Sequence, residues 1–144
     1  MPVLVMKGQM KNKAKIVTYI GNLCKELGIN RMYSKVIFLN FKTKIEDDAQ
    51  GLCWGDMKKG YCDIQISRTE EGNPLPFEQM MQTIAHEMVH AKQYFRGELN
   101  SYGSRVWKGR NAEGWKYENQ PWEREAFRLE EKLYKKCWPK INEK

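Results

Sequence analysis

One stretch near the N-terminus has the apolar spacing of an α-helix. Within residues 10–28, apolar side chains recur at intervals of four, three and four residues, at Ile16, Ile20, Leu23 and Leu27. This spacing places them on one face of a helix, and glycine, here Gly28, commonly ends one. The pattern therefore predicts an amphipathic helix over residues 10–28.

Three shorter stretches have the composition of β-strands. Ser34–Phe41 is rich in β-branched and aromatic residues, which is typical of a buried strand. Gln50–Asp56 and Tyr61–Ser67 flank a short polar turn, and the second of them alternates apolar and polar residues. We expect these last two strands to pair as an antiparallel hairpin.

Two more helices are predicted in the second half of the chain. After a turn-rich segment, a helix runs from about Pro76 to Arg96, where Gly97 would close it. A connection rich in glycine and aromatic residues follows, and Pro121 opens a last helix that ends near Trp138. The order of helix, small three-stranded antiparallel or mixed sheet, helix, long loop and helix predicts an α+β fold.

Length and composition fit one packed domain over residues 1–144. Hydrophobic residues make up 41% of the chain and aromatic residues 12%, which is enough for a core and unlike a disordered protein. No apolar run approaches the roughly 20 residues that span a bilayer. The apolar start, Met1 to Met6, is too short for a signal peptide. We expect a cytoplasmic protein with no membrane partner.

The four cysteines are widely spaced and form no CxxC pair. They are Cys24, Cys53, Cys62 and Cys137. In a reducing compartment such residues are free thiols, and this is the interpretation we favour. A disulfide between Cys53 and Cys62 across the predicted hairpin is the alternative.

The chain is basic, with a net charge of +7 and a pI of about 9.2. Such a balance favours acidic partners, for example nucleic acid or an anionic polymer. The lysines and arginines are spread along the chain, however, and near the C-terminus they alternate with glutamates. The charge therefore predicts at most weak binding of nucleic acid or an anionic polymer.

The predicted middle helix contains the sequence HEMVH, which uses the only two histidines of the chain. Residues four apart lie on one face of a helix, so His86 and His90 can bind one ion together. Glu87 lies slightly further round, where it can act as general base on a metal-bound water. The main apolar stripe is on the opposite side, so we expect the histidines to face a polar cleft. The motif is typical of a zinc-dependent hydrolase.

A catalytic zinc site needs a third protein ligand, which here has to be a carboxylate or a cysteine. The first turn of the last helix offers Glu123 and Glu125, near the positive end of the helix dipole. We prefer Glu123, because Ala126 one turn along is small and permits a close approach to the motif helix, whereas Glu125 is followed by Arg128. More distant candidates are Glu113, Glu118, Asp63 and, as a fourth ligand, Cys137.

These segments resemble a known class of enzymes. HEMVH followed by an ExxA helix, Glu123 to Ala126, is similar to the gluzincin class of zincin metallopeptidases. The strings HEMVHAKQY, WKGR and QPWEREA resemble small uncharacterised metallopeptidase-like proteins of tailed bacteriophages, over roughly residues 34–134. The resemblance implies Zn²⁺ held by His86, His90 and Glu123, with Glu87 as base, and a location in the host cytoplasm.

The chain departs from related patterns at two points. Some gluzincins have an ExxxD sequence, with an acid four residues after the ligand, and here that position is Phe127. SprT-like proteases and metzincins use a third histidine, which this chain lacks. The second departure weakens a role on DNA-linked substrates.

The leading hypothesis is a zinc peptidase that hydrolyses peptide bonds in a peptide or protein substrate lying along a free sheet edge. We expect the connection between the last two helices to form the other wall of the cleft. Candidate donors to the oxyanion of the reaction are Tyr94, Tyr102, Tyr117 and Arg105. One alternative is a peptidoglycan amidase or endopeptidase. The other is a non-catalytic, nucleic-acid-associated module with a structural zinc. The oligomeric state is left open.

Overall fold

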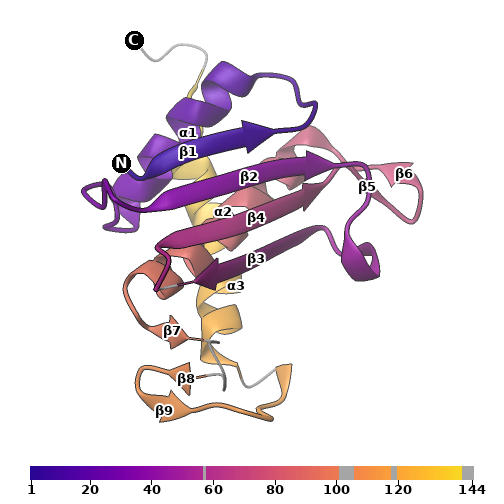
Figure 1. The fold of residues 1–144 in the computed structure, drawn as a ribbon. Helices are drawn as coiled ribbons and strands as arrows, with labels where there is room; N and C mark the ends of the chain where they lie inside the picture. Colours follow the sequence, from indigo (N-terminus) through magenta and orange to yellow (C-terminus); the bar gives the residue numbers. More distant parts are fainter. Residues whose placement is uncertain (57, 101–105, 118–119, 141–144) are drawn as a thin grey trace.

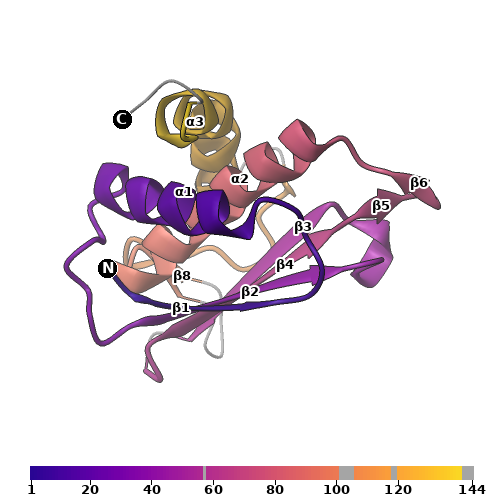
Figure 2. The ribbon, with the colours of Figure 1, turned by 90° about the horizontal axis from the view of Figure 1, so that it is seen from above.

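The computed structural model of the protein describes residues 1–56, 58–100, 106–117 and 120–140. It has an α+β fold, in which three helices lie on one face of a four-stranded sheet (Figure 1). The view from above shows the same two layers, with all three helices on one side (Figure 2). The helices are α1 (Lys13–Glu26), α2 (Phe77–Phe95) and α3 (Pro121–Cys137).

The central sheet has the strand order β1-β2-β4-β3. Its strands are β1 (Val3–Lys7), β2 (Val36–Lys42), β3 (Gly51–Asp56) and β4 (Tyr61–Ser67). The first two and β4 run parallel, whereas β3 is antiparallel to β4 and forms an edge of the sheet. Since successive residues of a strand point to opposite faces, Ile37, Leu39 and Ile64 all point toward the helices, where they are fully buried.

Short elements connect these larger ones. A 3₁₀ turn, η1 (Glu46–Asp48), precedes β3, and a small hairpin of β5 (Thr69–Glu70) and β6 (Asn73–Pro74) precedes α2. Between α2 and α3, three two-residue strands form a separate small sheet in the order β7-β8-β9. They are Leu99–Asn100, Val106–Trp107 and Arg110–Asn111.

Most of the predicted elements are confirmed. The apolar face predicted for α1 is its buried face, with Ile16, Ile20 and Leu23 fully buried. The hairpin of β3 and β4 is antiparallel as expected. The first helix begins at Lys13, three residues later than predicted.

Two predictions about the β-structure were wrong. The sheet has four strands, because the apolar N-terminus forms β1 and pairs in parallel with β2 across α1. A run of five residues does not reveal such a partner, since the pairing depends on a distant segment. The connection after α2 is also more ordered than a plain loop, because it contains β7, β8 and β9.

All four cysteines are free thiols. Cys53 pairs in register with Ile64, and Cys62 with Gly55, so the two cysteines lie diagonally rather than directly opposite. In the part of the chain that the structure describes, no helix has the length and apolar character needed to cross a membrane.

The edge strand β3 packs closely on α2 because glycine occupies the positions that face the helix. A Cβ atom at Gly55 would overlap the ring of Tyr94. A Cβ atom at Gly51 would lie only 2.8 Å from Oε2 of Glu87. Glycine therefore permits the backbone of β3 to run directly beside the motif residue Glu87.

We expect Gly55→Ala to destabilise the fold by about 1–3 kcal/mol, because the added methyl group forces β3 away from Tyr94. Urea denaturation would measure the change in the free energy of unfolding. Gly21→Ala on α1 is the matched control. Its Cβ would lie 3.6 Å from Met1 Sδ, an ordinary contact, so this change leaves stability equal or higher. Equal stability of both variants would show that β3 does not need this close approach.

Candidate metal centre

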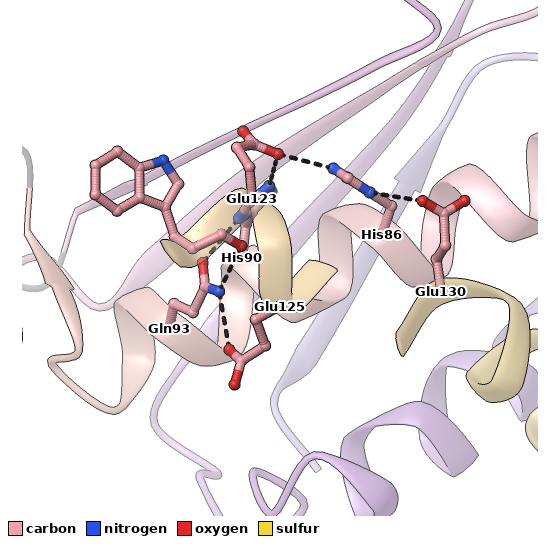
Figure 3. A network of polar contacts seen from close by, with 7 residues as sticks. His86, His90, Gln93, Glu123, Glu125 and Glu130 are labelled. Carbon is pink, nitrogen blue, oxygen red and sulfur yellow. Dashed lines mark hydrogen bonds and ion pairs between the residues drawn. The ribbon is translucent and has the colours of Figure 1, made fainter. Parts of the chain in front are cut away.

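Three predicted ligands converge where α3 begins beside α2 (Figure 3). The Nε2 atoms of His86 and His90 each lie 3.1 Å from Oε1 of Glu123. With bonds of about 2.05 Å, the corners of a zinc tetrahedron are about 3.3 Å apart. Two of the three distances are thus close to those in a zinc tetrahedron, and all three atoms lie within 4.8 Å of one another, so the group could hold one metal ion.

The orientation of His90 is set by Gln93, one turn further along α2. The Gln93 amide nitrogen donates to the Trp122 carbonyl at 3.0 Å and to Oε1 of Glu125 at 2.9 Å. Its oxygen is thereby turned toward Nδ1 of His90, 2.8 Å away. Because that oxygen can only accept, Nδ1 carries a hydrogen, and Nε2 is the ring nitrogen that faces Glu123.

His86 is oriented in the same sense by Glu130 of α3. Nδ1 of His86 lies 3.1 Å from Oε1 of Glu130, whose other oxygen accepts from Nε2 of Gln82 at 2.8 Å. A carboxylate only accepts, so this Nδ1 also carries the hydrogen. The Nε2 atoms of both imidazoles thus face one carboxylate oxygen. Positive charge stabilises this arrangement, and either protons on the imidazoles or a divalent metal ion can supply it.

The charges around the site favour the same conclusion. Burial by itself lowers the pKa of His86, but hydrogen bonds to Glu123 and Glu130 and the charge of Glu87 outweigh it and raise this pKa to about 9. Burial by itself raises the pKa of Glu123, whereas the two histidines lower it to about 2. Glu123 therefore stays ionised, and a cation would replace protons held on the imidazoles.

Glu87 is placed as an acid–base group. It is only 6% exposed and lines a cleft of about 310 Å³ together with the three ligand side chains. Burial raises the pKa of its carboxyl to about 7, although the positive charge of His90 and His86 opposes this shift. A carboxyl that titrates near neutral pH can both accept and release a proton during a reaction.

The cleft has three walls. The strand β3 provides Gly51, Leu52 and Cys53, and α2 and α3 provide the ligands. The connection between α2 and α3 provides Tyr117 and Gln120, as expected for this segment. Trp122 holds that connection against the start of α3, since its ring lies 5.9 Å from Trp107 and 6.1 Å from Trp115. This packing fixes the turn that carries Glu123.

The other predicted ligands lie elsewhere. Glu125 accepts from Lys92 at 2.9 Å and from Gln93, so it supports His90 instead of joining the cluster. Asp63 accepts from Asn40 on the far face of the sheet. Cys137 is fourteen residues from Glu123 along α3, about 21 Å at the rise of a helix. Among the described residues, the metal-holding group consists of the three predicted side chains alone.

Of the four remaining candidates, only one lies within the described residues. Glu118, Tyr102 and Arg105 lie outside the described residues. Glu113 is described and exposed, and it does not belong to the metal-holding group.

The prediction that the histidines face a polar cleft is confirmed, because both of them line it. His90, Glu87 and Gln93 are nevertheless buried. The reason is that α3 lies across this side of α2, where the fully buried Ala126 permits close contact. Sequence periodicity does not reveal a second helix of this kind.

Glu130 was not predicted, although the sequence contained an indication of its role. The position four residues after Glu123 is Phe127, whose ring contacts the His86 ring with centroids 4.6 Å apart. Glu130 is seven residues after Glu123, two turns along the same face of α3, and reaches Nδ1 of His86. The acid absent at position 127 is thus replaced by an acid one turn later.

A comparison with models of known protein families found no match for this chain. A comparison with curated protein sequences found no match either.

Glu123→Ala should abolish zinc binding, whereas Glu125→Ala should retain about one zinc ion per chain. The difference follows because only Glu123 meets both histidines. Metal content is measured by plasma mass spectrometry after zinc loading and desalting. Loss of zinc in Glu125→Ala with retention in Glu123→Ala would show that Glu125, and not Glu123, is the third ligand.

Glu130→Ala should weaken zinc binding by about 10- to 100-fold, because His86 loses the partner that holds its ring and tautomer. Competition with a chromophoric chelator measures the affinity. Glu131→Ala is the matched control, since Glu131 is exposed and pairs with Lys135 on the surface. An equal affinity of both variants would contradict the role of Glu130.

Proposed function

We propose that this protein is a zinc-dependent peptidase of the gluzincin type. The observation that carries the proposal is the position of buried Glu87 beside His86, His90 and Glu123, in a cleft open to solvent. Three protein ligands leave a further coordination position, which is typical of catalytic zinc sites. A structural zinc uses four protein ligands, and the suspected fourth, Cys137, lies at the other end of α3.

Glu87 would perform the proton transfers of peptide hydrolysis. Zinc supplies Lewis acidity, which lowers the pKa of water and polarises a carbonyl group. Glu87 accepts a proton from the attacking water and passes it to the leaving amine. Burial of Glu87 raises the pKa of this carboxyl, which makes it a better proton acceptor.

The edge strand β3 is a suitable binding site for the substrate backbone. It pairs with β4 on one side, and its residues Gly51, Leu52 and Cys53 line the cleft next to Glu87. An extended peptide can add to such an edge through main-chain hydrogen bonds. The scissile bond would then lie between β3 and the three ligands.

Tyr117 is the best-placed donor for the oxyanion that forms during hydrolysis. It lines the cleft, and burial together with the charges of Glu123, Glu87 and Glu130 raises the pKa of its hydroxyl. The group therefore stays protonated and can donate a hydrogen bond. Tyr94 also lines the cleft, but its ring is held beneath Gly55.

Glu87→Gln should lower the turnover of a peptide substrate by at least about 100-fold while zinc content and fold are retained. A proteome-derived peptide mixture is incubated with zinc-loaded protein, and mass spectrometry counts new termini. Glu78→Gln, an exposed change in the first turn of α2, is the matched control and should cleave like wild type.

Undiminished cleavage by Glu87→Gln would contradict the assignment of Glu87 as the general base. If wild type leaves peptides intact but solubilises peptidoglycan, the same site serves the amidase or endopeptidase alternative. Retention of zinc without either activity would favour the non-catalytic alternative.

A further inference from the structure

The sheet face opposite the helices forms a second surface, on the other side of the sheet from α2 and α3. No helix of the described chain covers it, as the two views show (Figures 1 and 2). We call it the open face, defined by its apolar side chains Val3, Val36, Phe38, Leu52, Trp54 and Tyr61. These belong to all four strands of the sheet, so the surface is continuous from one edge to the other.

Three aromatic rings from neighbouring strands meet on the open face. Tyr61 on β4 lies 5.9 Å from Phe38 on β2 and 5.8 Å from Trp54 on β3, measured between ring centroids. Trp54 is 51% exposed although it is the largest side chain of the strand. Exposure of a tryptophan within an aromatic cluster indicates a binding surface rather than a scattered surface residue.

The open face is bordered by lysines at both ends of the strands. Lys7 and Lys42 end β1 and β2 and point to the same side as Phe38, and Lys35 and Lys59 lie at the opposite end of the sheet. Two acids lie on the same face among the aromatic residues. Asp63 is in register with Phe38 and with Trp54. Asp56 is in register with Tyr61.

The nearby acids are partly engaged already. Asp63 accepts a hydrogen bond from Asn40, and Asp56 accepts one from the backbone of Lys59. The acidic turn η1 lies beyond the end of β2, and its Asp48 accepts from the backbone of Glu71. The surface is therefore an aromatic platform with two hydrogen-bonded acids on it and lysines at both ends of the strands.

We propose that the open face binds single-stranded nucleic acid. Unpaired bases can stack on Trp54, Tyr61 and Phe38, because every base has a π-face. The phosphates can then follow the lysines at the ends of the strands, with Lys35 and Lys59 at the end away from the acidic turn η1. Aromatic side chains on an exposed four-stranded sheet are a recurring way to bind single strands.

A second copy of the chain suits this face less well. A high net charge of one sign opposes self-association. The net charge of +7 on the whole chain points in the same direction, toward an anionic partner.

The test is fluorescence anisotropy with a labelled oligothymidylate of about 12 nucleotides, titrated with the full chain. Trp54→Ala should weaken binding by about 5- to 100-fold, the loss expected for one base stacked on an aromatic ring, and Trp54→Phe should retain more of the affinity. Circular dichroism and zinc content, measured in parallel, show that each variant is folded.

A matched pair of double variants separates a defined site from diffuse charge. Lys35→Glu with Lys59→Glu should reduce affinity strongly, whereas Lys15→Glu with Lys132→Glu, on exposed positions of α1 and α3, should reduce it much less. Equal losses in both pairs would overturn the proposal in favour of non-specific charge. Absence of binding, with a wild-type dimer in sedimentation that Trp54→Ala dissociates, would assign the face to a second copy.

Discussion

The candidate metal centre depends on one constraint, the approach of α3 to α2. This contact sets Glu123 against both imidazoles and brings Glu130 and Glu125 to the groups that support them. The carboxylate and the two imidazoles are stabilised by positive charge, which protons on the rings or a bound cation can supply. The packing of the two helices therefore creates the candidate site, and small Ala126 makes that packing possible.

Buried polar groups around the site are satisfied by a connected network. Gln93 is fully buried, yet its amide contacts His90, Glu125 and the Trp122 carbonyl. Lys92 continues this network to Glu98, next to β7. Each partner removes a choice of rotamer or tautomer from the next, so the ligand atoms are held in position before an ion arrives.

The two faces of the sheet are used for different purposes. The face toward the helices supplies the core and, at the edge strand β3, one wall of the cleft. The opposite face carries exposed aromatic side chains with lysines at the strand ends. Because residues alternate along β3, Cys53 lines the cleft while Trp54 is exposed on the opposite face, and Leu52 borders both, so one strand serves both surfaces.

Local periodicity allowed the sequence to predict α1, α2, α3, the β3–β4 hairpin and the shared face of His86 and His90, since these depend on neighbours within one or two turns. The preference for Glu123 also came from a local feature, the small residue one turn later. The parallel pairing of β1, the burial of His90 and the roles of Gln93 and Glu130 were decided by the tertiary structure alone. Each depends on contacts between segments distant in sequence, and no repeat within a segment records which distant segment will pack against it.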